Sequence, residues 1–229
     1  MPPHARTTQG INGTGHIPIT DQSSIVQLVR KFSTTAALNK VYEWRAYSVE
    51  PKEFKSFIEL TSQWIHLRTN HSPLVGYWIS EIGGINDVVH LWEYDNLDQR
   101  AAVRLALSQD QHWISNYISK MTPMLARQEN SLLQLVGPDN LSQPDIKGVY
   151  EIQQFSSSES LEGLQGKKRG DAKLLGTFQG ITGPMGTAYQ LWYHQSPNHY
   201  MHNITSSNAT SNVPGHSRLL LPTAWSPLK

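Results

Sequence analysis

The chain has 229 residues and a mass of 25.8 kDa, enough for one or two domains. Its 19 lysines and arginines nearly balance 18 acidic residues, so the net charge of +1 gives no overall field for nucleic acid or an anionic membrane. The lack of cysteine excludes a disulfide scaffold, thiol nucleophiles, Cys-ligated zinc and iron–sulfur clusters. No apolar run approaches the ~20 residues of a transmembrane helix.

Residues 1–40 differ in composition from the rest of the chain. They contain four basic residues, one acidic residue (Asp21) and many serines, threonines and glycines. Such a segment buries too little apolar surface to order its backbone, so we predict that it is disordered. The basic composition, the apolar stripe at 25–32 and the cleavage-like sequence RKFS at 30–33 favour a mitochondrial transit peptide. An ordinary flexible tail is the alternative.

The remainder of the chain contains an internal repeat. Residues 41–47 (VYEWRAY) return as 149–155 (VYEIQQF), 74–76 (LVG) as 174–176 (LLG), and 91–94 (LWEY) as 191–194 (LWYH). Order and spacing agree between the two sets, which indicates a tandem duplication. We therefore predict two modules, at 41–138 and 147–229, joined by a connection near 137–148.

The first module reads as β-α-β-β-α-β. Alternating residues predict strands at 41–47, 77–82 and 88–94, with the second and third forming a hairpin, and a fourth strand at 132–136. Apolar residues at helical spacing predict a helix after Pro51. Two further helices are expected, one capped by Asp98 and a longer one from about His112 towards Arg127, bent by Pro123. This order predicts an α+β fold of ferredoxin-like modules.

The second module is predicted to be incomplete. Residues 156–170 support at most a short helix, and the polar stretch 201–216 offers no equivalent of the helices that follow the third strand of the first module. A sheet without its covering helices exposes apolar surface, so we expect this module to lean on the first module or on another chain.

Several blocks resemble the NipSnap family. They are residues 41–47, 66–78 (HLRTNHSPLVGYW) and 90–96 (HLWEYDN), while the tail 219–229 (LLLPTAWSPLK) resembles the third-homologue branch of that family. The resemblance covers 41–138 densely and 147–229 in pieces.

The resemblance implies a dimeric α/β-barrel type of fold and a non-enzymatic role. It implies protein–protein contacts in mitochondrial quality control, autophagy-receptor recruitment or vesicle traffic, without a cofactor. It further implies a mitochondrial protein, in the matrix or membrane-associated and also cytosolic, that forms homo- or hetero-oligomers through barrel-type sheets. The incomplete second module departs from the family pattern.

One strand face offers an alternative with chemistry. Val88, His90, Trp92 and Tyr94 share a face of the third strand, and in a barrel this face could line a cavity. His90, with Tyr94, would then be a catalytic candidate, and His90 a general base or a haem ligand of a small barrel enzyme. The competing interpretation is a buried, hydrogen-bonded histidine in an aromatic core. No metal-ligand, nucleotide-binding or nucleophile motif accompanies these residues.

A protein-binding role would need exposed aromatic or arginine anchors. The candidates for such an interaction surface are Arg68, Trp78, Arg100, Arg104 and Trp225. Trp225 lies between Pro222 and Pro227, where an extended segment could dock onto a partner or pack back on its own module.

Overall fold

The computed structural model describes residues 40–137, 141, 143–156, 164, 168–184, 186–206 and 215–229. All of them belong to one compact unit that spans 38–229. The predicted leader therefore lies outside the described residues, apart from Lys40. No helix within the described ranges is both long enough and apolar enough to cross a membrane.

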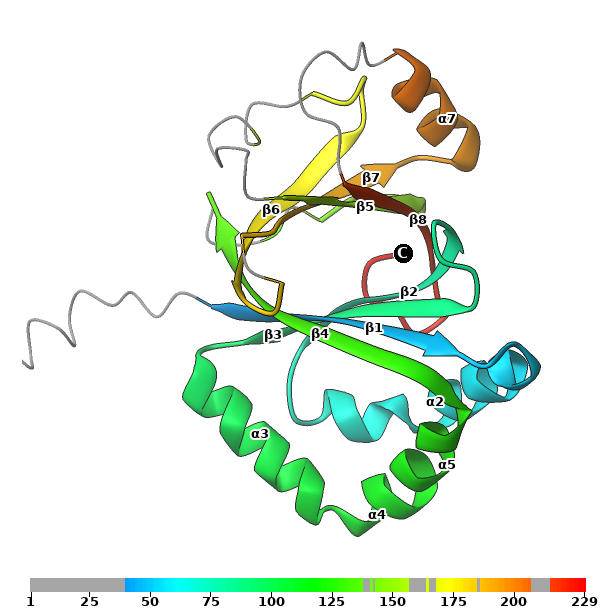
Figure 1. Cartoon of the computed structure of the whole chain (residues 1–229), viewed down its shortest axis with the longest axis vertical. Helices are drawn as coiled ribbons and strands as arrows, with labels where there is room; N and C mark the ends of the chain where they lie inside the picture. The colour runs from blue at the N-terminus through cyan, green and yellow to red at the C-terminus, as the bar shows by residue number, and fades with distance from the viewer. Residues whose placement is uncertain are drawn as a thin grey trace, which may run out of the picture. The chain divides into compact units, whose positions relative to one another are not determined.

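Eight antiparallel strands form a closed barrel in the order β1-β3-β2-β8-β5-β7-β6-β4 (Figure 1). Their bounds are β1 Val41–Val49, β2 Leu74–Ile82, β3 Asp87–Tyr94, β4 Leu125–Val136, β5 Val149–Phe155, β6 Lys173–Thr182, β7 Ala188–His194 and β8 His216–Pro222. The eight-stranded barrel and the mixed helix and strand content confirm the predicted α+β class.

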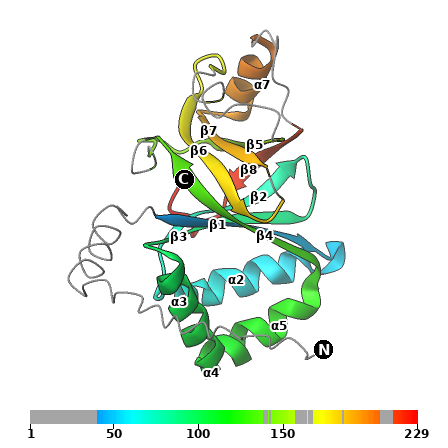
Figure 2. The same cartoon turned by 60° about the vertical axis from the view of Figure 1, so that its left-hand side comes forward.

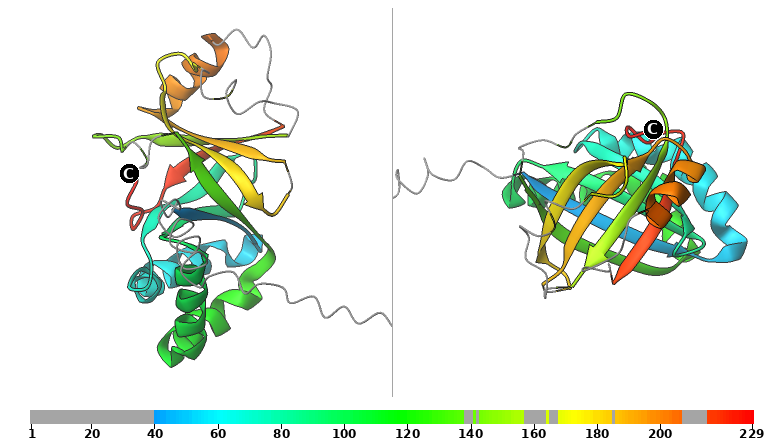
Figure 3. Two further views of the ribbon diagram at one scale, coloured as in Figure 1. Left: turned by 90° about the vertical axis from the view of Figure 1, so that its left-hand side faces the viewer. Right: turned by 90° about the horizontal axis from the view of Figure 1, so that it is seen from above.

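Helices cover the barrel on two opposite sides (Figures 1 and 2). On the side of the first four strands lie the turn η1 (Pro51–Glu53), α2 (Phe54–Thr69) and α3 (Leu97–Gln109), followed by the helical run α4 (Gln111–Trp113), η2 (Ile114–Ile118), α5 (Ser119–Met121) and η3 (Thr122–Met124). On the opposite side lies α7 (Pro197–Ser206), as the turned views in Figure 3 also show.

The two halves of the barrel share one strand order and one register. The first half runs β4-β1-β3-β2 and the second β8-β5-β7-β6. Glu43 of β1 pairs with Trp92 and Leu132, and Glu151 of β5 pairs with Trp192 and Leu219. Each half also has an irregularity at the same point, between residues 74 and 76 and between 174 and 176. Positions in the two halves can therefore be compared one by one.

The barrel closes within a single chain. Strand β2 pairs with β8, from Trp78 opposite Pro222 to Ile82 opposite Leu219, and β4 pairs with β6. The family resemblance implied oligomers formed through barrel-type sheets, but the strand edges of both half-sheets are paired inside this chain. Barrel-type sheet pairing between subunits is not how this barrel forms, because each of its eight strands already has two neighbours.

Two apolar cores follow from the alternation of side chains along each strand. Tyr42, Trp44 and Ala46 of β1 point into the barrel, where they pack in one core with residues of both halves, such as Leu91 of the first half and Tyr150 of the second. The next residues along β1 point outward and pack beneath the helices, in a second core that includes Tyr47, Phe57, Trp92 and Tyr117.

Three predictions about helices are wrong. Helix α7 follows β7, although no helix was expected after Trp192, and its last residues, 201–206, belong to the polar stretch 201–216. The long helix ends at Met124 because Pro123, which has no amide hydrogen to donate, lies in its closing turn, so β4 begins at Leu125 and is longer than predicted. Asn96 rather than Asp98 caps α3, accepting a hydrogen bond from the Gln99 amide at 2.8 Å.

The predicted short helix within 156–170 falls mostly outside the described residues. Leu164, which the structure does describe, is helical and buried. The division into modules at 41–138 and 147–229 stays a prediction.

Replacing Trp78 by Ala should destabilise the barrel strongly. Its side chain is fully buried and its ring lies 5.6 Å from that of Tyr150 in the other half, so the substitution removes a contact between halves and leaves a cavity. We expect a loss of about 3–5 kcal/mol in the free energy of unfolding, measured by denaturant titration. Ile85→Ala, at an 82% exposed residue, is the control and should change it by less than about 0.5 kcal/mol. Equal midpoints for the two variants would contradict the packing described.

Candidate functional site

A cavity of about 440 Å³ lies between the first half of the sheet and its helices. Its floor comes from outward-facing residues of β1, β2 and β3, and its walls from α2, α3, α4, η2 and α5. The floor residues are Arg45, Tyr47, Tyr77, His90 and Trp92. The predicted face of β3 does line a cavity, but this cavity lies under the helices and not inside the barrel.

His90 presents a hydrogen-bond donor to this cavity. The Trp92 indole Nε1 donates to His90 Nδ1 at 2.5 Å, and an indole nitrogen can only donate, so Nδ1 carries no proton. Burial and the nearby charge of Arg45 lower the pKa of His90 well below its usual range, which keeps the ring neutral. The single proton is therefore on Nε2, which is buried and has no hydrogen-bond partner among the described residues.

Tyrosine rings surround His90. Tyr77 stacks on it with ring centroids 4.8 Å apart and an interplanar angle of 6°, and Tyr47 meets it edge-on at 4.8 Å. Tyr77 and His90 are opposite residues of β2 and β3, which brings their side chains together. Burial raises the pKa of the Tyr77 hydroxyl, so it stays protonated. The Thr61 and Tyr117 hydroxyls lie close enough to influence it, but none of the described residues makes a hydrogen bond of normal geometry with its oxygen. A second donor thus lies beside His90.

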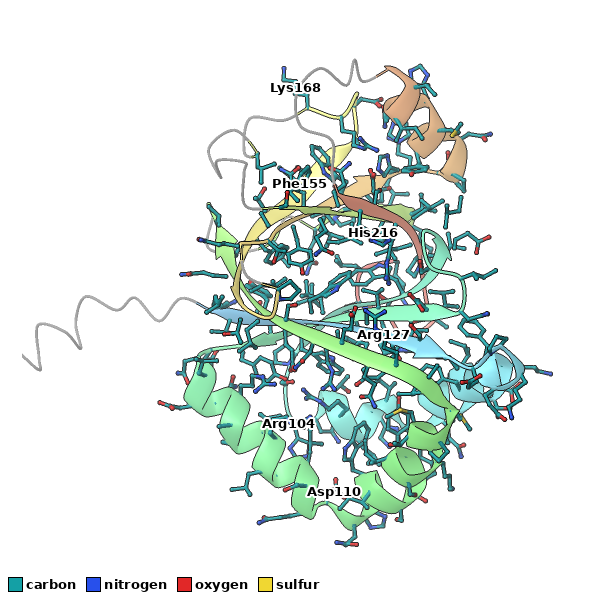
Figure 4. All side chains as sticks on the ribbon, viewed as in Figure 1. Arg104, Asp110, Arg127, Phe155, Lys168 and His216 are labelled. Carbon is teal, nitrogen blue, oxygen red and sulfur yellow. The ribbon has the colours of Figure 1, made fainter. Side chains whose placement is uncertain are left out.

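Three arginines add positive charge to the cavity. Arg45 lies on the floor, and its buried Nε has no partner within the described ranges. Arg68 stacks over the Trp92 ring at 4.0 Å and donates to the Tyr94 hydroxyl at 2.6 Å and to Ser72 Oγ at 2.5 Å. Arg104 is exposed and reaches the cavity from α3 (Figure 4).

Beneath these residues lies a buried carboxylate, Glu43. It accepts hydrogen bonds from Arg100 Nη2 at 2.8 Å, Asn130 Nδ2 at 2.9 Å and the Tyr94 hydroxyl at 3.0 Å. Burial alone would raise its pKa, but the Arg100 hydrogen bond, the charge of Arg45 and the Asn130 hydrogen bond bring the pKa of Glu43 down to about 2. Glu43 is therefore ionised, and it holds Tyr94 and Arg100 in place below the cavity.

The second half repeats this carboxylate at the corresponding position. Glu151 is fully buried and accepts from Arg169 Nε at 2.5 Å, from Ser217 Oγ at 2.6 Å and from Gln153 Nε2 at 3.0 Å. His194 Nε2 lies 3.5 Å from it, at the position that Tyr94 occupies in the first half. Each half thus buries one glutamate beneath its outer face, paired with an arginine.

The outer face of the second half is packed where the first half has its cavity. Gln190 stands at the position of His90, and its amide donates to the Leu164 carbonyl at 2.7 Å and to Thr177 Oγ1 at 3.2 Å. Leu164 is buried against Phe155 and Ala188. In this half the amide donor at the position of His90 has partners, and a leucine occupies the space above the strands.

The structure places the predicted site residues in three ways. His90 and Arg104 line the cavity, while Tyr94 lies below it in the Glu43 network. Trp78 is fully buried inside the barrel, Arg68 is a buried residue of α2, and Arg100 is bound to Glu43, so none of the three has the exposure of an anchor. Trp225 is partly buried and packs on Tyr77 of the first half, and not on its own predicted module.

Sequence reasoning missed Glu43, Arg45, Tyr47 and Tyr77 as members of this site. The signal for the carboxylate was available, because the Val-Tyr-Glu triplet is repeated at 41–43 and 149–151 and a glutamate at such an apolar position needs a cationic partner. For the tyrosines no signal was available, because a strand tyrosine is equally frequent in an ordinary core. No group of three or more potential metal ligands occurs among the described residues.

Comparison with known proteins places the chain in a family. The NIPSNAP family model matches residues 42–138. Human NipSnap homolog 3A is 34% identical over 211 residues, which cover 82% of this chain and 85% of that protein. The chain belongs to the NIPSNAP family. This NIPSNAP chain is also 31% identical to mouse NipSnap homolog 3B over 211 residues, with the same coverage of 82% and 85%.

The solved structures support the architecture. A proposed monooxygenase from Fusobacterium nucleatum is similar with a TM-score of 0.54, covering 84% of this NIPSNAP chain and 94% of that chain at 7% sequence identity. At such identity the likeness concerns the fold alone.

Replacing Glu43 by Gln tests the buried carboxylate. Since its pKa is lowered from 4.5 to about 2 on folding, the ionised form stabilises the fold fully above pH 4.5, and this contribution is lost as the pH falls through about 2. We expect Glu43→Gln to lower the free energy of unfolding by about 3 kcal/mol at pH 7, with the difference from the unsubstituted chain shrinking below pH 4.5. Denaturant titrations of both proteins between pH 7 and 2 measure this difference in the free energy of unfolding.

The exposed Glu59, which pairs with Lys55 on α2, provides the control. Glu59→Gln should cost at most about 0.5 kcal/mol at any of these pH values. A pH-independent loss in Glu43→Gln would show that the charge of Glu43 does not stabilise the fold.

Proposed function

We propose that this NIPSNAP protein binds a small, largely apolar molecule that carries an oxygen acceptor, preferably a carboxylate, in the cavity around His90. The observation that carries the proposal is a pair of buried donors without partners among the described residues, His90 Nε2 and Arg45 Nε, with the Tyr77 hydroxyl as a third donor on the ring stacked against His90. Leaving such a donor unpaired costs about 1–3 kcal/mol, and a ligand oxygen would recover this cost.

Charge and size support the same class of ligand. Arg45, Arg68 and Arg104 outnumber the single carboxylate of Glu43 beneath them, so the cavity favours an anion. Its walls are mainly apolar and aromatic, from Ile65, Leu107, Trp113, Ile118 and Met121. A volume of about 440 Å³ is within the range of small-molecule sites, ~300–1,000 Å³.

The second half supports the proposal by contrast. There the side-chain nitrogen of Gln190 donates to the Leu164 carbonyl and to Thr177, and Leu164 fills the space above the strands. A paired donor at this position and a packed apolar wall are therefore compatible with this architecture. The unpaired donors of the first half are thus not a requirement of the fold, which favours a role in binding.

The alternative of a haem-binding or barrel enzyme does not fit His90. Because Nδ1 accepts from Trp92, Nε2 carries the ring proton and has no free electron pair for iron or for accepting a substrate proton. Neither ligation of haem nor general-base catalysis by His90 follows from this arrangement. Tyr94 is also not among the residues that line the cavity.

Family membership supports a second proposal, on the cellular setting. We propose a mitochondria-associated protein that acts through protein contacts, in quality control, autophagy-receptor recruitment or vesicle traffic. Support comes from its NipSnap relatives and from the basic, nearly acid-free composition of residues 1–40. Of the predicted contact residues, Arg104 is exposed and available to a partner. A ligand-binding cavity and a partner surface would both use this part of α3.

Binding of 2-naphthoate tests the ligand proposal. The probe has an aromatic body and a carboxylate, and its neutral methyl ester serves as the uncharged comparison. We expect the purified chain to bind the acid more tightly than the ester, by isothermal titration calorimetry. His90→Phe keeps an aromatic ring at this position and removes the Nε2 donor. It should weaken binding of the acid about tenfold to a hundredfold.

The matched control is His202→Phe, which removes an exposed histidine of α7 on the other side of the barrel. It should leave the affinity for 2-naphthoate unchanged. Absence of binding, or equal affinities of the His90→Phe and His202→Phe variants, would contradict the proposal.

Fusion of residues 1–40 to a fluorescent reporter tests the localisation. We expect the reporter to accumulate in mitochondria, because a basic amphipathic segment is drawn to the import machinery. Reversing the charge of Arg30 and Lys31 with glutamates should abolish import. A diffuse cytosolic signal from the unaltered fusion is the outcome that contradicts a transit peptide.

A further inference from the structure

The orientation of Tyr77 depends on the C-terminal tail that follows β8. Thr223 donates to the Tyr77 carbonyl twice, through its amide at 3.0 Å and its hydroxyl at 3.1 Å. Ser226 Oγ accepts from the Tyr77 amide at 2.9 Å and donates to the Leu228 carbonyl at 2.7 Å. Both backbone polar groups of Tyr77 are thus bound by the tail.

The tail also contacts the side chain of Tyr77. The ring of Trp225 meets that of Tyr77 edge-on, with centroids 5.4 Å apart and an interplanar angle of 63°. On its other side the Tyr77 ring lies flat against His90, at 4.8 Å and 6°. Tyr77 is therefore held between a tail residue and the donor histidine of the cavity.

The tail is itself fixed to the second half of the barrel. Leu228 is buried inside the barrel, and the Lys229 carbonyl accepts from the Gly148 amide at 3.1 Å and from the Tyr150 hydroxyl at 3.0 Å. The segment from Thr223 to Lys229 thus connects the floor of the cavity in the first half to strand β5 of the second half. Because this segment is bound at both ends, its own position is fixed, and it can hold Tyr77 in one orientation.

We propose that Trp225 and Ser226 are positioning residues for the ligand site. They set the plane of the Tyr77 ring against His90, so that Tyr77 Oη and His90 Nε2 reach one ligand oxygen together. This inference rests on the proposed function, which it extends with residues that do not line the cavity. Two donors that converge on one acceptor bind it more tightly than either donor alone only if their geometry is held before binding.

A double-substitution cycle tests the inference. Affinity for 2-naphthoate is measured for the unsubstituted chain, Ser226→Ala, Tyr77→Phe and the double variant. If Ser226 acts through the Tyr77 hydroxyl, Ser226→Ala should weaken binding about two- to tenfold, and it should have no effect when Tyr77 is already Phe. An equal loss in both backgrounds would overturn the proposal, because it would indicate a general loss of structure.

Trp225→Leu in the same cycle gives a second test should Ser226→Ala fold poorly. It removes the edge contact to Tyr77 and leaves Ser226 in place, and the same dependence on Tyr77 is expected. The matched control is Thr205→Ala, which removes a comparable hydroxyl-to-backbone hydrogen bond on α7, to the Met201 carbonyl at 3.0 Å. It should change neither affinity nor its dependence on Tyr77.

A measurement without ligand separates this inference from the proposed function. The stacked Tyr77 ring shifts the NMR signals of the His90 ring protons, so Ser226→Ala and Trp225→Leu should move these signals, and Thr205→Ala should not. Unmoved signals in both tail variants would overturn the positioning role even if 2-naphthoate binds. Moved signals without any binding of 2-naphthoate would overturn the ligand proposal and leave the structural coupling intact.

Discussion

The structure depends on the pairing of β2 with β8 and of β4 with β6, which closes two half-sheets into one barrel within a single chain. Each half-sheet alone would expose an apolar face and two unpaired edges, and closure removes both. The inner face becomes a shared core, in which Trp78 of one half packs on Tyr150 of the other. The outer face must then be covered by helices, and every functional feature described here lies on that outer face or at its border.

The outer face of each half carries a buried glutamate, and this repeated charge organises what lies above it. A carboxylate without water must have hydrogen-bond donors around it, which Arg100 and Asn130 supply in one half and Arg169 and Ser217 in the other. In the first half the network continues through Tyr94 to Arg68, which is thereby held over Trp92. Trp92 in turn determines which nitrogen of His90 bears its proton.

Much of the fold was predictable from the repeat, and less of the site. The repeated blocks located the strands well, because period-two alternation is a local property of the chain. Helix α7 was missed because its sequence is polar at many positions, and a helix that covers a sheet with few contacts needs only a narrow apolar stripe. His90 was found as a candidate from its strand face. Its role as a hydrogen-bond donor was not predicted. The position of the proton on the His90 ring depends on Trp92 and Arg45, and only the fold brings these residues close to it.

The filling of the second half by Leu164 and Gln190 has a consequence for stoichiometry. A barrel of two identical halves would present two equal sites related by symmetry, and occupancy of one could alter the other through the common core. Among the described residues, the first half has the cavity around His90, while in the second half Leu164 fills the corresponding space. Saturation of the site around His90 should therefore follow a simple hyperbola with one ligand per chain, without cooperativity between the halves.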